Sequence, residues 1–232
     1  MTPLPIVLIP GLLSSSRFYE PVLAALWRYG PVMVANHTQD DGMAAIARRI
    51  LAAAPPHFAL AGHSMGGYLA FEIMRQAGER VGKLALLDTS ARADTPEQSE
   101  RRRAQITITE KGRFDTIPAL QYPNLVHPSR LDDAALRETV RQMADDNGPQ
   151  AFIRQQTAIM NRIDSRESLA PIHCPTLVLV GDSDAITPPD RAAEIAAGIR
   201  GSTLVTIPEC GHMCVLEQPE AVTEALVEWL SA

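Results

Sequence analysis

The chain has 232 residues, of which 46% are hydrophobic and 21% charged, and its formal net charge is −6. This composition is sufficient for a sizeable core in one large domain or two small ones. The negative charge argues against nucleic acid as a partner. Three cysteines, an odd number, suggest no disulfide framework and are typical of a reducing, cytoplasmic compartment.

The first residues, MTPLPIVLIPGLL, are apolar, but they fit neither a signal peptide nor a membrane helix. No Lys or Arg precedes the apolar run, prolines interrupt it, and it is too short to span a bilayer. We therefore expect a cytoplasmic protein that does not use a membrane as a partner.

Six short apolar runs predict strands. They are Ile6–Ile9, Val32–Ala35, Phe58–Ala61, Leu84–Leu87, Thr176–Val180 and Thr203–Ile207. Nearly continuous apolar runs are typical of parallel strands that helices cover on both faces. Segments with helical periodicity separate them, such as the stripe between Met43 and Leu51 and the one after Pro219. The alternation predicts an α/β fold with a mostly parallel, doubly wound sheet of about six strands flanked by helices.

The alternation stops between about residues 91 and 170, where no convincing strand occurs. A helical stripe covers Leu131–Asn147, with Asp132 or Asp133 as its N-cap and Gly148 as its stop. We predict that residues 91–170 form a mainly helical cap over the carboxyl edge of the sheet. Residues 1–90 and 171–232 then form the core into which this cap is inserted.

Residues 61–70 read AGHSMGGYLA, so that a G-x-S-x-G pattern centred on Ser64 joins a predicted strand to a predicted helix. Small residues two positions before and after a serine permit a sharp, strained turn, the nucleophile elbow. The turn would lift the hydroxyl to the end of the sheet, beside a helix N-terminus that can stabilise an oxyanion. The same pattern would also suit a tightly packed glycine-rich turn or one that holds a phosphate.

A serine nucleophile needs a base and a group that orients the base. His212, in PECGHM, follows the last predicted strand, and Asp182 and Asp184 follow the strand before it. All these groups would project from the same edge of a parallel sheet, where open α/β sheets place their sites. Asp88 is a rival for the acid because it also follows a predicted strand, although it could simply cap the turn into the insertion.

Together with Ser64, the Gly181–Asp184 segment and the Gly211–His212 pair resemble motifs of the α/β-hydrolase family, and the resemblance covers essentially the whole chain. It implies that Ser64 is the nucleophile, His212 the base and Asp184 the acid. It further implies six main strands, fewer than in longer members of the family.

The resemblance also implies an oxyanion hole formed by two backbone amides. The first donor is Met65, the residue after the nucleophile, and the second is Leu12, in the loop after the first strand. In this loop Pro10 stands where many members of the family have a histidine.

Residues 91–170 contain more apolar side chains than the insertion needs to hold itself together, so some should face Ser64. Our candidates for substrate contacts are Leu13, His63, Phe114, Tyr122 and Met143. We expect His63 to pack under the elbow without reacting.

Other motifs predict no additional chemistry. Cys210, His212 and Cys214 lack the second ligand pair of a structural zinc site, so we predict no metal and no cofactor. The run Arg101–Arg103 is expected to be a solvated helix face, with binding of an acidic substrate group as the alternative. The remaining histidines are expected on the surface or in loops. They are His37, His57, His127 and His173.

The sequence therefore predicts a serine hydrolase that cleaves a small- to medium-chain carboxylic ester, a small-molecule substrate, through an acyl-enzyme. Within the same fold, lactone hydrolysis, carbon–carbon bond hydrolysis, and perhydrolysis or acyl transfer remain alternatives. A ligand receptor that retains the triad is the alternative from a different class.

Overall fold

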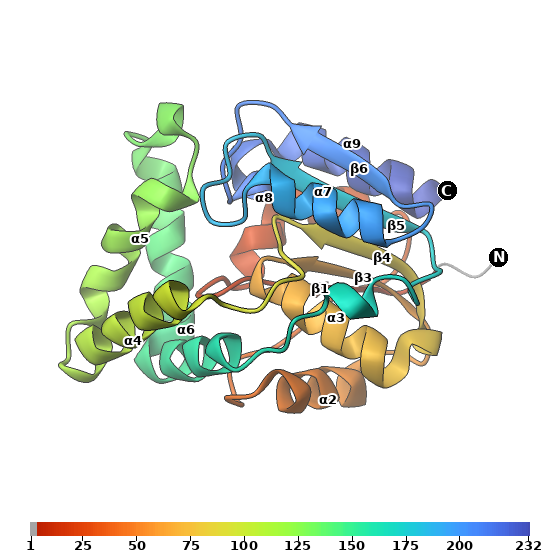
Figure 1. The fold of residues 1–232 in the computed structure, drawn as a ribbon. Coiled ribbons are helices and arrows are strands. Elements are labelled where there is room, and N and C mark those ends of the chain that lie inside the picture. Colours follow the sequence, from red (N-terminus) through yellow and green to blue (C-terminus); the bar gives the residue numbers. More distant parts are fainter. Residues whose placement is uncertain (1–3) are drawn as a thin grey trace.

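The structure is a computed structural model that describes residues 4–232, and within them it contains one six-stranded sheet in which all neighbouring strands are parallel (Figure 1). The strand order is β2-β1-β3-β4-β5-β6. The strands are β1 (Ile6–Ile9), β2 (Val32–Val34), β3 (Phe58–His63), β4 (Val81–Leu87), β5 (Thr176–Gly181) and β6 (Thr203–Ile207). The predicted α/β architecture with six main strands is confirmed.

Helices cover both faces of the sheet, and three more lie between β4 and β5. The helices are α1 (Glu20–Leu26), α2 (Met43–Ala53), α3 (Met65–Ala77), α4 (Pro96–Glu110), α5 (Ile117–Leu125), α6 (Ala134–Met160), α7 (Pro189–Gly198), α8 (Cys214–Glu217) and α9 (Pro219–Ser231). No helix in residues 4–232 combines the length and the apolar character needed to cross a membrane.

Two apolar layers hold the sheet between its helices. Along β1, Val7 and Ile9 pack with the layer of α2, α3 and α7, whereas Ile6 and Leu8 pack with that of α1, α8 and α9. This alternation follows from the two-residue period of a strand, which sends successive side chains to opposite faces. The central strands are therefore buried on both sides, and their carboxyl ends have fixed positions.

The two edge strands correct the expectation of burial on both faces. All residues of β2 are half-buried, and in β6 only Ile207 is buried, while Leu204 is 42% exposed. An edge strand has a neighbouring strand on one side only, so its residues are less covered. The apolar character of a short run does not indicate whether the strand lies at the centre or at the edge of the sheet.

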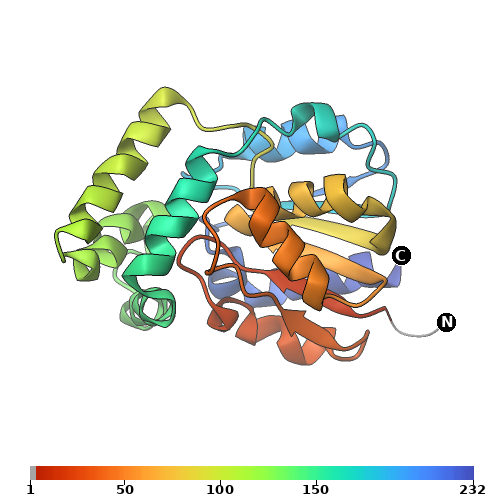
Figure 2. The same cartoon turned by 90° about the horizontal axis from the view of Figure 1, so that it is seen from below.

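Helices α4, α5 and α6 belong to the insertion between β4 and β5 and lie together beyond the carboxyl ends of the strands (Figures 1 and 2). The N-cap of α6 is Asp133, whose side chain accepts a hydrogen bond from the Leu136 amide. Gly148 interrupts the helical conformation with φ 77°, but the helix continues to Met160. The predicted stop is therefore a kink, because the proline at position 149 is suited to start a second helical segment.

Candidate active site

Ser64 lies in a strained turn between β3 and α3, with φ 53° and ψ −114°. The residues two positions before and after it are glycines because other parts of the backbone pass too close for side chains. A Cβ atom on Gly66 would lie 2.1 Å from the carbonyl oxygen of Ile9, and one on Gly62 would lie 2.3 Å from that of Gly66. The backbone conformation of Ser64 is therefore imposed by its surroundings, and it holds the hydroxyl at the carboxyl end of the sheet.

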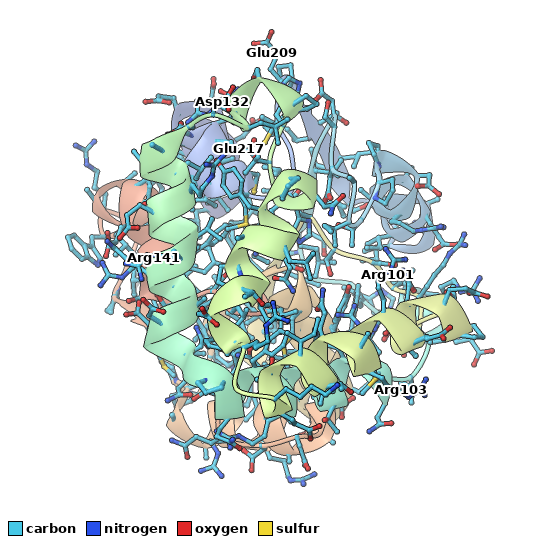
Figure 3. The ribbon with its side chains drawn as sticks, turned by 90° about the vertical axis from the view of Figure 1, so that its left-hand side faces the viewer. Arg101, Arg103, Asp132, Arg141, Glu209 and Glu217 are labelled. Atoms are coloured by element: carbon cyan, nitrogen blue, oxygen red, sulfur yellow. The ribbon has the colours of Figure 1, made fainter. Side chains whose placement is uncertain are left out.

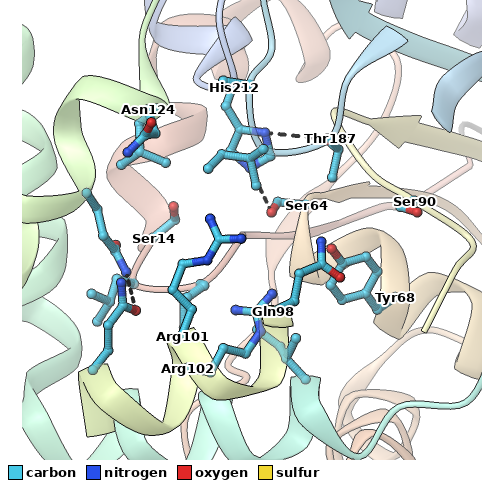
Figure 4. Close-up of a pocket in the computed structure, with 18 of the residues that line it drawn as sticks. Ser14, Ser64, Tyr68, Ser90, Gln98, Arg101, Arg102, Asn124, Thr187 and His212 are labelled. Atoms are coloured by element: carbon cyan, nitrogen blue, oxygen red, sulfur yellow. Dashed lines mark hydrogen bonds between the residues drawn. The ribbon is translucent and has the colours of Figure 1, made fainter. Parts of the chain in front are cut away.

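Three side chains from the ends of three different strands form one hydrogen-bonded chain. Ser64 Oγ lies 2.8 Å from His212 Nε2, and His212 Nδ1 lies 2.8 Å from Asp184 Oδ2 (Figure 4 shows the first contact). All three residues are buried. This arrangement can transfer the hydroxyl proton of Ser64 to an imidazole that a carboxylate orients.

Asp184 is held by the loop that carries it. Its Oδ1 accepts hydrogen bonds from the amides of Ile186 (2.8 Å) and Thr187 (3.0 Å), and its Oδ2 accepts one from the Thr187 hydroxyl (2.7 Å). Sequence reasoning missed Thr187. The spacing Asp-x-x-Thr was the available signal, since an aspartate often accepts hydrogen bonds from amides just after it.

The environment shifts the pKa values of His212 and Asp184 in opposite directions. Burial alone would lower the pKa of His212, but the charge and hydrogen bond of Asp184 raise it above its ordinary value. Burial would raise the pKa of Asp184, yet His212 and Thr187 outweigh this and lower it. The site thus favours an ionised Asp184 that stabilises a proton on His212.

The two other candidate acids have different partners. Asp182 accepts hydrogen bonds from the amides of Glu209 (3.0 Å) and Cys210 (3.2 Å), so it braces the loop that leads to His212. Asp88 is fully buried, and its Oδ1 accepts a hydrogen bond from the Gly181 amide at 2.8 Å. Burial, followed by the charge of Asp184, raises the pKa of Asp88. Neither side chain is hydrogen-bonded to His212 within the described residues.

Among the described residues, both predicted oxyanion donors have unpaired backbone amides. Met65 is the first residue of α3, and Leu12 follows β1 and lines the cavity beside Ser64. Between residues 4 and 232, neither of these backbone amides donates a hydrogen bond to another residue. An unpaired amide at a helix N-terminus favours negative charge, as an oxyanion hole requires.

A buried polar network that sequence reasoning missed braces the loop after β1. The amide of Leu13 donates a hydrogen bond to Oε1 of Gln155 in α6 at 3.2 Å. His37 Nε2 lies 2.9 Å from the Gly11 carbonyl oxygen and 3.2 Å from Gln155 Nε2. His37 is in a loop, as predicted, but it is buried and not at the surface, because α6 packs over it.

A cavity of about 510 Å³ lies between Ser64 and the helices of the insertion. Of the predicted substrate contacts, Leu13, His63 and Met143 line it. His63 is stacked on Phe18 and its Nε2 lies 2.8 Å from the His212 carbonyl oxygen. Burial, aided by the charge of His212, lowers the pKa of His63 to about 3, so this ring stays neutral and supports the His212 backbone.

Phe114 and Tyr122 do not line the cavity. Phe114 packs against Phe152, with ring centroids 5.8 Å apart. Tyr122 is buried, and its hydroxyl shares its one proton between the carbonyl oxygens of Arg130 (2.9 Å) and Asp133 (3.2 Å). These side chains hold the insertion together, and an apolar pattern does not distinguish this role from substrate contact.

The cysteines near His212 are buried thiols. Burial raises the pKa of both Cys210 and Cys214. In the described part of the chain, no group of three or more His, Cys, Asp and Glu side chains has an arrangement that could hold a metal ion.

Comparison with known proteins relates the chain to several hydrolases. It is 28% identical to RutD of Azorhizobium caulinodans, which is named as a carbamate hydrolase, over 96% of this chain and 89% of that protein. It is 27% identical to the pimeloyl-[acyl-carrier protein] methyl ester esterase of Nitrosomonas europaea, over 72% of this chain and 68% of that protein. The structure of a thermophilic esterase from Thermogutta terrifontis matches with a TM-score of 0.89 and 32% identity, over 98% of this chain and 89% of that one.

The profile of the Alpha/beta hydrolase family matches residues 6–225. This range includes every strand of the sheet and the turn at Ser64. The chain belongs to the alpha/beta hydrolase family.

Proposed function

We propose that this hydrolase cleaves carboxylic esters with small to medium acyl groups through an acyl-enzyme on Ser64. The observation that carries the proposal is the hydrogen-bonded chain of Ser64, His212 and Asp184, whose serine end faces the cavity. The names of two relatives, both esterases, support an ester as the bond that is cleaved.

In the first half of the reaction, Ser64 Oγ attacks the ester carbonyl carbon while His212 Nε2 accepts the hydroxyl proton. Asp184 stabilises the resulting imidazolium, and the amides of Leu12 and Met65 stabilise the oxyanion. The carbon–oxygen bond to the alcohol then breaks, and His212 donates its proton to the departing alkoxide. This leaves the acyl group on Ser64 and a neutral imidazole.

In the second half, water takes the place of the alcohol. His212 removes a proton from the water as it attacks the acyl carbon, and the same amides hold the second oxyanion. Collapse releases the carboxylic acid and returns the proton to Ser64. The helices α4–α6 serve as the cap that encloses the acyl group during both halves.

Carbamate hydrolysis is a second candidate, favoured by the identity to RutD. The same attack would place a carbamoyl group on Ser64. Rates on a panel of aryl esters, carbamates, lactones and diketones would decide among the bond types. Slow single-turnover labelling with a tightly bound ligand, without turnover of any panel member, would favour a receptor.

We expect the specificity constant kcat/KM for aryl esters to rise with acyl length and then to fall. Each methylene that fits the cavity contributes about 0.8 kcal/mol, which corresponds to a rise of about threefold to fourfold per carbon. The wall of the cavity should be reached between acetyl and octanoyl. A profile that still rises at palmitoyl, or a jump in activity at an oil–water interface, would contradict this expectation.

We also expect kcat/KM for an uncharged ester to rise with pH and reach a plateau. His212 must be neutral to accept the Ser64 proton, and Asp184 raises its pKa above the ordinary value, so the midpoint should lie above about pH 6.5. Initial rates between pH 5 and 9 would test this. A midpoint well below the ordinary histidine value, or activity that falls across this range, would exclude His212 as the base.

A further inference from the structure

Five arginines line the cavity, and among residues 4–232 no Asp or Glu lines it. The arginines are Arg92, Arg101, Arg102, Arg162 and Arg191. The whole chain carries a net charge of −6, so the sign at the cavity is the reverse of the overall charge. We propose that the site is specific for esters that carry a carboxylate and that Arg101 binds this group. This inference rests on the proposed ester hydrolysis.

Carboxylates behind the cavity wall neutralise two of these arginines. Arg92 Nε lies 2.9 Å from Glu194 Oε2, and a second hydrogen bond of 2.9 Å joins the same two side chains. Arg191 lies 3.1 Å from Asp190. Neither guanidinium therefore adds an unbalanced charge to the cavity.

Arg102 and Arg162 share a single carboxylate, that of Asp94. The hydrogen-bonded contacts are 2.7 Å and 2.5 Å, and the Asp94 side chain is 1% exposed. Two positive charges on one carboxylate leave an excess of one positive charge beside the cavity. Arg162 also lies over the ring of Tyr68, 4.2 Å from its centroid, which holds this wall in place.

Arg101 has no such partner. Within residues 4–232 it forms no ion pair or side-chain hydrogen bond, not even with Glu97 one turn earlier in α4. It is exposed, and in Figure 4 its guanidinium reaches from α4 toward Ser64 and His212. An Arg guanidinium matches a carboxylate with two parallel hydrogen bonds, and here it would not have to leave another carboxylate first.

Polar side chains around Arg101 could complete the subsite. Gln98 and Asn124 line the same cavity and are labelled with Arg101 in Figure 4. The Gln98 side chain accepts a hydrogen bond from the Thr95 amide, which leaves its NH₂ group free. Apolar side chains such as Met143 and Ile108 also line the cavity, so they could contact the methylenes between the ester and the carboxylate.

The test compares pairs of substrates that differ only in charge. One pair is the 4-nitrophenyl half-ester of adipic acid and its carboxamide analogue, with the charge in the acyl group. The other is the butyrate ester of 4-hydroxybenzoate and that of 4-hydroxybenzamide, with the charge in the alcohol. We expect the kcat/KM of the wild-type protein to be about tenfold or more higher for the anion than for the amide in one of the two pairs. The difference should come mainly from a lower KM for the anion. Each rate is corrected for uncatalysed hydrolysis.

Variants on α4 locate the effect. Arg101→Gln should reduce the anion-to-amide ratio of kcat/KM by about tenfold, and Arg101→Lys should keep most of the preference. Arg103→Gln is the matched control, because Arg103 is exposed, lies on the same helix and does not line the cavity (Figure 3). It should leave both rates unchanged. The preference should also weaken between 20 and 500 mM salt, since an exposed charge is screened.

Equal rates on both members of each pair would overturn the inference, and so would an Arg101→Gln variant that loses both rates equally. The proposed function fails in a different way. If Ser64→Ala cleaved the carboxamide analogues as fast as the wild-type protein, Ser64 would not be the nucleophile, whatever the charge preference.

Discussion

The Ser64→Ala variant should hydrolyse aryl esters about 10⁴–10⁶-fold more slowly than the wild-type protein. The hydroxyl it lacks is the group that would attack the carbonyl carbon, and His212, 2.8 Å away in the structure, would have no other nucleophile to activate in the first step. The measurement is kcat/KM on a short-chain ester, with the folded state checked by circular dichroism. Since the variant only shortens a side chain at the cavity surface, the fold should persist.

Ser14 provides a matched control because it lines the same cavity but is not hydrogen-bonded to His212. Ser14→Ala should stay within a few-fold of the wild-type rate. An organophosphonate should label Ser64 stoichiometrically, since only a hydroxyl with an adjacent base and oxyanion donors reacts quickly. Labelling of Ser14, Ser15 or Ser16 instead, or a Ser64→Ala variant with a near-normal rate, would contradict the assignment.

Asp184→Asn should lower kcat by about 10³–10⁴-fold. The carboxylate accepts the proton on His212 Nδ1 and so leaves Nε2 free to act as the base. An amide can donate to Nδ1 and thereby favour the wrong tautomer of the imidazole. The same substitution removes the charge that raises the pKa of His212, so the midpoint of the pH profile should move to lower pH.

Two further aspartates serve as controls with the same change in side chain. Asp182→Asn and Asp88→Asn should each retain most of the activity, because Asp182 binds the amides of Glu209 and Cys210, and Asp88 binds that of Gly181. A loss at Asp88 larger than that at Asp184 would transfer the acid role to Asp88. Thermal unfolding of each variant separates a loss of stability from a loss of catalysis.

Local patterns were enough to predict the architecture and the candidate nucleophile and base of the site. Strand runs such as Phe58–Ala61 are apolar because both faces are buried, and that requirement is visible in a single stretch of sequence. The glycines around Ser64 likewise indicate, within a few residues of sequence, that other backbone atoms pass close by. Positions after predicted strands placed Ser64, His212 and the candidate acids Asp182 and Asp184 at one edge of the sheet, and the resemblance to the family selected Asp184.

Side-chain roles that depend on contacts with distant segments could not be predicted from local patterns. The apolar pattern did not separate Phe114 and Tyr122, which hold the insertion together, from Met143, which lines the cavity. Nothing near His37 in the sequence signals that Gln155, more than a hundred residues later, covers it. Such roles depend on which helix packs where, and that is decided by the sum of many weak contacts across the whole core.

Arg101 and Arg102 show the same limit within two adjacent residues. Successive residues of a helix point about 100° apart, so Arg102 meets Asp94 and Gln156, whereas Arg101 reaches the cavity without a partner. In the sequence both arginines belong to one basic run, which is typical of a solvent-exposed helix face. Their difference in charge balance arises only when the segment before α4 folds so that Asp94 meets Arg102 and not Arg101, because pairing requires the two side chains to lie within a few ångströms.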